Sequence, residues 1–170
     1  MSTMDWSRWF RHVFAGRRAL NKAFPAATLD AIEAAIIESE RSHGAEIRFA
    51  VEGALDPAEI RQSISPRDRA LEVFAALGVW DTEGNNGILV YVLLADHDVE
   101  IVADRGYNER VSTTEWQAVC EEMERCFREG RFEEGSVHGV RGVGRLAARH
   151  FPPPVGGRTR DELPNRPTLL

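Results

Sequence analysis

Polar side chains crowd both ends of one apolar run in the sequence, Ile88–Leu94. Acids and amides precede this run at positions 81–86, and more acids follow the next apolar segment at positions 104–109. Carboxylate and amide oxygens suit a hard cation such as calcium or magnesium. Clustered carboxylates also raise one another's pKa, which can prepare a general acid or base. The candidate metal ligands are Asp81, Glu83, Asn86, Asp104 and Glu109.

The same residues also have a purely local explanation. The sequence Asn-Asn-Gly at 85–87 is typical of a turn, and Asp81 can cap a turn. Acidic side chains in loops are normally solvated. Arg105 and Arg110 follow closely enough to neutralise much of the negative charge. The spacing of an EF-hand calcium loop is absent, and no histidine pair or phosphate-binding glycine loop adds to the signal. The sequence therefore leaves a solvated loop, a cation site and a catalytic site open.

The elements around these residues predict that they meet at one edge of a sheet. Residues 46–52 alternate between apolar and charged, which predicts a half-buried strand. Residues 88–94 and 99–104 form an antiparallel hairpin that turns at Asp96-His97. Pairing residue 94 with 99 places Asn86 near Tyr107 and Leu89 near Asp104. The start of the first strand, at Glu46, is expected on the same edge.

The order of elements predicts an α/β fold. Apolar periodicity and capping residues predict helices over about 5–20, 29–43, 66–77, 113–129 and 133–150, with a short helical turn at 58–64. A right-handed β-α-β crossover makes the first two strands parallel. We expect a three-layer α/β/α sandwich with a small mixed sheet of three strands or four, plus an extra N-terminal helix. The predicted organisation is an N-terminal amphipathic helix at 1–22, an α/β domain at 23–151 and a disordered Pro- and Gly-rich tail at 152–170.

The N-terminal helix has an aromatic face. Apolar residues recur at helical spacing, and arginines occupy other positions. Such a helix can lie in a membrane interface, or its aromatic face can dock on the protein's own core or on a protein partner. The candidate contact residues are Trp6, Trp9, Phe10, Val13 and Phe14.

Composition narrows the classes of function. The net charge of −6 argues against a nucleic-acid-binding protein, although residues 1–25 carry five cations against one acid. Cys120 and Cys126 have neither disulfide nor zinc spacing, which indicates reduced thiols. The sequence shows no apolar stretch of membrane-spanning length and no signal-peptide pattern. We therefore expect a cytoplasmic protein at the inner membrane surface; the oligomeric state stays open.

The segment "NNGILVYVLLADHDVEIVADRGYNERVSTTEW" is preceded by "ALEVFAALGVWDTEG" and followed by "EEMERCFREGRFEEGSVHGVRGVGRLA". This combination resembles the TPM domain family over about residues 26–150, as a divergent member of bacterial type. The resemblance implies an α/β/α sandwich, calcium binding in some members and weak acid phosphatase activity in others. It also implies a role in maintaining membranes or protein complexes.

The chain departs from the family pattern at the acidic site. Asn86 and Gly87 match, but the segment "NKAFPAAT" lacks the family's usual Asp, and the family's Gly-Leu-Glu is here Gly106-Tyr107-Asn108. Ser112 or Thr113 replaces a further Asp. The first hypothesis is therefore a TPM-like binding or accessory module that assists a membrane-associated or protein-complex process, with a depleted acidic site. The alternative is a calcium- or magnesium-assisted acid phosphatase that acts on phosphomonoesters through the five candidate ligands.

Overall fold

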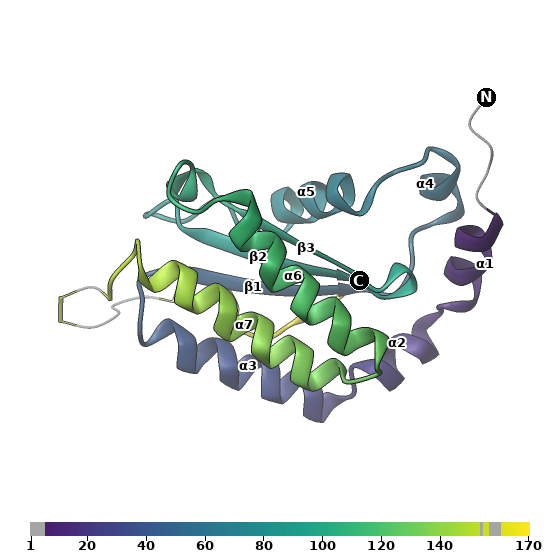
Figure 1. Ribbon diagram of the computed structural model, residues 1–170, viewed down its shortest axis with the longest axis horizontal. Helices are drawn as coiled ribbons and strands as arrows, with labels where there is room; N and C mark the ends of the chain where they lie inside the picture. The colour runs from purple at the N-terminus through teal and green to yellow at the C-terminus, as the bar shows by residue number, and fades with distance from the viewer. Residues whose placement is uncertain (1–5, 154, 157–160) are drawn as a thin grey trace.

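A mixed sheet of four strands lies between two helical layers in the computed structural model, which describes residues 6–153, 155–156 and 161–170 (Figure 1). The strands are β1 (Glu46–Glu52), β2 (Gly87–Leu93), β3 (Asp98–Ala103) and β4 (Thr168–Leu169), in the order β3-β2-β1-β4. β1 runs parallel to β2 and β4, whereas β3 is antiparallel to β2. The predicted α/β class, mixed sheet and parallel crossover are confirmed.

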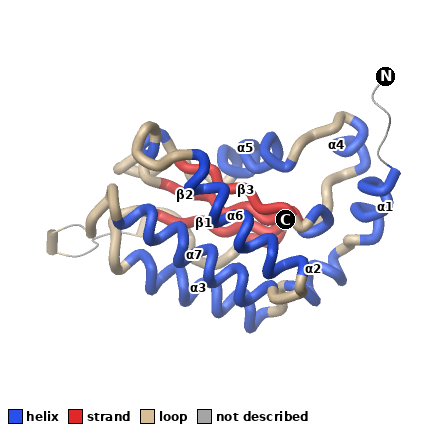
Figure 2. The backbone as a smooth tube through the Cα atoms, viewed as in Figure 1, coloured by secondary structure: helices blue, strands red, loops and turns tan. Residues whose placement is uncertain are grey.

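Helices cover both faces of this sheet (Figure 2). One face packs against α3 (Ala26–Glu40), α6 (Thr113–Arg128) and α7 (Phe132–Ala148) around a large apolar core. The opposite face packs against α5 (Pro66–Ala76), next to the short helix α4 (Pro57–Arg61). The glycines of α7 allow close packing: a Cβ at Gly139 would lie 2.1 Å from Met123 Sδ of α6. Within the described part of the chain, no helix is both long and apolar enough to span a membrane.

The N-terminal segment forms two helices where the sequence predicted one. α1 spans Trp6–Phe14 and α2 spans Arg17–Ala23, with Gly16 at the N-cap of α2. The continuous 3.6-residue periodicity hid this break, because an interruption of two residues barely disturbs the pattern. The next helix, α3, begins at Ala26 rather than at the predicted Leu29, because Pro25 takes the N-cap position.

The hairpin register differs by two residues from the predicted one. The observed pairs include Val92 with Val99 and Ile88 with Ala103. The 3₁₀ turn η1 (Leu94–Asp96) and the left-handed His97 take up residues that the prediction had assigned to the strands. A shift of two residues leaves every side chain on its predicted face, because side chains alternate with a period of two.

The C-terminal residues 161–170 belong to the fold, so the predicted disordered tail is wrong for this segment. β4 pairs with β1, and Leu163 is buried in the smaller apolar cluster. Arg48 of β1 donates to the carbonyl oxygens of Pro164 and Arg166 and to Thr168 Oγ1. Composition alone missed this segment, because its order depends on partners more than 100 residues away. The segment also makes β1 fully buried rather than half-buried.

Candidate functional site

The two loops of the predicted acidic edge lie side by side. Asp104 N donates to Gly87 O at 2.9 Å, and Gly106 N donates to Asn85 O at 3.0 Å. Arg105 Nε donates to Asn85 Oδ1 at 2.7 Å. The hairpin thus brings residues 81–87 and 104–109 together as the antiparallel topology predicted.

Two candidate ligands present acceptor oxygens at this edge. Asn86 is 6% exposed, and its Nδ2 donates to Gly44 O at 2.7 Å. Its Oδ1 is buried and accepts no hydrogen bond from the residues that the structure describes. Asp104 caps the 3₁₀ turn η2 (Arg105–Tyr107) through Oδ1, which accepts from Arg105 N at 2.7 Å. Its Oδ2 is likewise buried without a described donor.

The three remaining candidates, Asp81, Glu83 and Glu109, are exposed. Glu83 contacts the C-terminal segment through its backbone, whose N–H donates to Glu162 Oε2 at 3.0 Å. Glu109 lies in a left-handed turn at φ 64°. In the part of the chain that the structure describes, no three carboxylates of the predicted set lie close enough together to bind one metal ion. The predicted five-residue metal site therefore stays a prediction.

A different carboxylate cluster, which the sequence did not reveal, does converge. Oxygens of Glu40, Glu46 and Asp161 lie within 4.8 Å of one another, and both glutamates are buried. Glu40 Oε1 accepts from Ile47 N, and Glu46 Oε2 accepts from Leu163 N. The bond to Glu40 ties α3 to β1, and the bond to Glu46 fastens the C-terminal segment to β1, so both glutamates have structural roles. The alternating charge of β1 was the only sequence signal that pointed to Glu46. Asp161 gave none, because it lies in the segment that was predicted to be disordered.

Two buried polar groups that resemble catalytic arrangements have structural roles instead. Glu52 accepts from Tyr91 Oη at 2.5 Å and from Arg69 through Nε and Nη2, both at 2.8 Å. Burial raises the pKa of Tyr91 most, and the hydrogen bond to Glu52 raises it further, so that it lies far above its ordinary value and Tyr91 remains a hydrogen-bond donor.

The second group is the pair of His43 and Ser39. His43 Nδ1 accepts from Ala45 N, so Nε2 carries the proton and donates to Ser39 Oγ at 3.0 Å. In this tautomer His43 does not act as a base toward Ser39.

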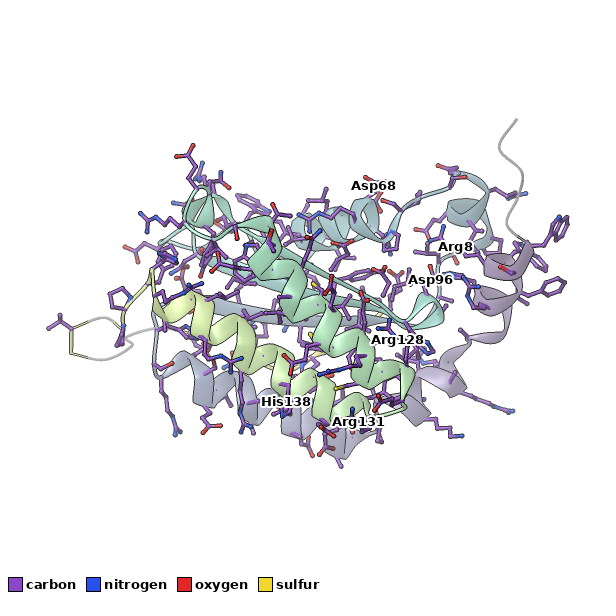
Figure 3. All side chains as sticks on the ribbon, viewed as in Figure 1. Arg8, Asp68, Asp96, Arg128, Arg131 and His138 are labelled. Carbon is purple, nitrogen blue, oxygen red and sulfur yellow. The ribbon has the colours of Figure 1, made fainter. Side chains whose placement is uncertain are left out.

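The N-terminal helix α1 attaches to the domain mainly through its basic face. Arg8 points toward Asp96 (Figure 3). Its Nε donates to Asp96 Oδ2 at 2.9 Å, and Arg11 Nη2 lies 3.2 Å from Asp96 Oδ1. His12 is 4% exposed; its Nε2 lies 3.2 Å from Asp96 Oδ2, and its Nδ1 accepts from Leu55 N. Burial raises the pKa of Asp96, but hydrogen bonds from His12 and Arg8 outweigh it and hold this pKa well below its usual range. Asp96 is therefore a charged anchor for α1.

The aromatic face of α1 consequently points away from the domain. Trp6, Phe10 and Val13 are 59%, 51% and 47% exposed, whereas Trp9 packs partly against the smaller core cluster. The rings of Trp9 and Phe10 meet edge to face with centroids 5.3 Å apart. The side chain of Phe14, the fifth predicted contact residue, lies outside the described residues.

The fold and sequence define the class of protein. The TPM domain family matches residues 20–146, and the chain belongs to that family. It is similar to BA42 from the psychrophilic bacterium Bizionia argentinensis, with 31% identity and a TM-score of 0.71, over 85% of this chain and 94% of that one.

Two further solved structures share the fold. The N-terminal domain of a P. gingivalis protein has 20% identity and a TM-score of 0.56, covering 74% of this chain and 79% of that chain. The N-terminal domain of cg2496 from Corynebacterium glutamicum has 13% identity and a TM-score of 0.52, covering 72% of each chain. A comparison with the curated proteins gave no match.

Proposed function

We propose that this TPM-domain protein is a binding module that attaches to a membrane surface through α1 and there assists a membrane-associated process. The observation that carries the proposal is the outward aromatic face of α1, formed by Trp6, Phe10 and Val13. Contiguous exposed apolar side chains on a helix mark interaction sites. Aromatic residues on one face of an amphipathic helix are suited to the boundary between lipid headgroups and acyl chains.

The way in which α1 docks supports this proposal. Ion pairs of Arg8 and Arg11 with Asp96 fix the helix by its polar side. The domain therefore positions the aromatic side chains without burying them. A helix that served only to complete the core would bury its apolar face, as α6 buries Met123 and Phe127.

The expected affinity is modest and mostly apolar. A fully buried aromatic side chain removes about 150–250 Å² from water, so Trp6 and Phe10, each roughly half exposed, have ~100 Å² each still to bury. At about 25 cal/mol per Å², with a smaller share from Val13, the total is at most ~6 kcal/mol. This resembles the reversible membrane attachment that a single acyl chain provides. Because Asp96 already engages Arg8 and Arg11, we expect anionic lipid to strengthen binding only moderately.

Flotation with vesicles of phosphatidylcholine, with and without added phosphatidylglycerol, tests the proposal. An anionic surface attracts a nearby cation by about 1 kcal/mol, so the two vesicles separate the apolar from the electrostatic contribution. The wild-type chain should float with both vesicles, and Trp6→Ser combined with Phe10→Ser should remove binding without altering the melting temperature. Trp80→Ser is the matched control, because Trp80 is 55% exposed on the loop after α5. Equal flotation of both variants would exclude α1 as the contact. No flotation of the wild-type chain would refute the membrane proposal and leave a protein partner as the occupant of this face.

The free acceptor oxygens of Asn86 and Asp104 favour a second candidate function, a calcium- or magnesium-dependent site at the acidic edge. A phosphatase would also need cations to stabilise charge on the phosphoryl oxygens. The nearby arginines have other contacts: Arg105 bonds to Asn85, and Arg110 lies over the Phe151 ring at 5.5 Å. These contacts favour cation binding over phosphoryl transfer, and a calcium titration tests the site.

A further inference from the structure

A cleft of about 630 Å³ lies at the end of the domain where four segments converge. These are α1, α2, the β2–β3 turn and the α6–α7 turn, which lie together in Figure 1. Its volume falls within the range of small-molecule sites. Six of its described lining side chains are apolar: Ala15, Ala19, Ala23, Leu94, Ala95 and Phe132.

The sequence keeps this cleft open. Ala19 and Ala23 lie one turn apart on α2, and Ala15 lies in the break before α2, so a row of three small side chains lines the cleft together with Phe132. Phe132 is itself held in place, because its ring contacts those of Phe24 and Phe127 at centroid distances of 5.6 and 5.4 Å. The cleft thus has one rigid aromatic wall and one shallow aliphatic wall, which fit a slender apolar group.

The charged residues at the cleft favour an anion. Two cations, Arg11 and Lys22, line it together with the ring of His97, and none of its described lining residues is acidic, although the chain as a whole carries −6. Asp96 is nearby, but Arg8 and Arg11 together more than balance its charge. Arg11 donates to Ser7 and Asp96 and still has N–H groups to offer, since a guanidinium carries five.

A neighbouring cleft of about 590 Å³ shares Lys22 and Phe132 but differs in charge. Two acids, Glu133 and Glu134, line it together with Lys22, Arg131 and Arg141, so both signs of charge are mixed there. Of these two clefts, the larger one combines an apolar interior with charged side chains that, among the described lining residues, are all cations. This contrast identifies the larger cleft as the candidate site for an anionic ligand.

We propose that the cleft formed by α1, α2 and the two turns binds a free single-chain carboxylate of the fatty-acid class. The alkyl chain lies between the alanine row and Phe132, and the carboxylate meets Lys22 and His97 at the rim. A nucleotide or a sugar would require a wall with many polar groups, whereas most of the described side chains that line this cleft are apolar. The site is separate from the outward face of α1 and does not depend on attachment to a membrane.

Isothermal titration calorimetry with decanoate, kept below the concentration at which it forms micelles, tests this proposal. The full chain should bind saturably with a stoichiometry near one. Lys22→Gln combined with His97→Gln should weaken binding by about tenfold or more, because the contact with the Lys22 ammonium and a hydrogen bond from the His97 ring are both lost. Arg18→Gln, on α2 but outside the cleft, is the matched control and should bind as wild type. Ala19→Phe, which fills the cleft, should abolish binding.

Two ligand controls separate charge from chain. Acetate lacks the chain and octyl glucoside lacks the charge, so neither should match decanoate. Absence of saturable binding, an unchanged affinity in the Lys22/His97 double variant, or equal binding of octyl glucoside would each overturn the proposal. Both residues of the double variant are exposed, so the test does not depend on Ala19→Phe folding.

The two proposed sites can fail independently. The Trp6/Phe10 double variant should retain decanoate binding, and the Lys22/His97 double variant should retain vesicle flotation. Loss of decanoate binding on changing Trp6 and Phe10 would show that decanoate occupies the outward face of α1 and would refute the cleft.

Discussion

Asp98 is a carboxylate that the fold destabilises. It lies at the start of β3, an edge strand, and its Oδ1 is buried with no hydrogen-bond partner among the described residues. Burial, followed by the like charges of Glu100, Glu124 and Asp96, raises the pKa of Asp98 to about 6, while Arg8 opposes the shift. We predict that Asp98→Asn stabilises the protein at neutral pH.

The size and pH dependence of this effect follow from linkage. In the unfolded chain Asp98 loses its proton near pH 4, and in the folded protein near pH 6. Stability therefore falls as pH rises between these values, and the full penalty is present above pH 6. About two pKa units correspond to ~3 kcal/mol, which partial exposure reduces to ~1–2 kcal/mol.

Thermal unfolding of both proteins from pH 4 to pH 8 measures the effect. Asp98→Asn should melt about 3–6 °C higher at pH 7.5, and the difference should become small near pH 4, where Asp98 is protonated in the folded protein and about half protonated in the unfolded chain. Glu121→Gln controls for the loss of one negative charge, because Glu121 is exposed on α6. An equal gain at pH 4 and pH 7.5 would show that packing, not ionisation, is responsible. No gain at pH 7.5 would refute the burial argument.

Three further predictions concern other parts of the fold. Deleting residues 161–170 should lower the free energy of unfolding by about 3 kcal/mol or more, measured by urea denaturation, because the buried Arg48 loses its acceptors; an unchanged midpoint would contradict this. If the acidic edge binds calcium, millimolar calcium should raise the melting temperature, and Asp104→Asn with Glu83→Gln should abolish the shift; a flat titration of the wild-type protein would exclude the site. Burial raises the pKa of Cys120 to about 12, so iodoacetamide should label it much more slowly in native than in unfolded protein at pH 8, and equal rates would refute this.

Local signals in the sequence were sufficient for most of the architecture. The Ser65-Pro66 start of α5 and the Ser112–Glu115 capping box of α6 are recognisable because the cap and its partners lie within four residues. The apolar run at Ile88–Leu94 predicted the position of β2, the first strand of the hairpin. The meeting of residues 81–87 with 104–109 followed from antiparallel topology, and it survived the two-residue error in register.

The orientation of α1 and the carboxylate cluster depended on long-range partners and were not predictable from local pattern. Periodicity located the aromatic and basic faces of α1, but Asp96, 85 or more residues away, decides which face meets the domain. Similarly, the third member of the carboxylate cluster, Asp161, approaches Glu40 and Glu46 through the C-terminal segment. Such arrangements depend on residues whose separation in sequence carries no periodic signal.

The polar positions of β1 show why alternation misled the burial prediction. Glu46, Arg48 and Glu52 occupy alternate positions, a pattern typical of a solvated strand face, yet all three are buried. Each has a specific partner: Leu163 N for Glu46, carbonyls of the C-terminal segment for Arg48, and Arg69 with Tyr91 for Glu52. The C-terminal segment that lies along β1 has irregular backbone, and its buried N–H and C=O groups require hydrogen-bond partners. Side chains of β1 supply these partners. Glu46 and Arg48 therefore mark the path of the C-terminal segment along β1, whereas Glu52 ties β1 to α5 and β2.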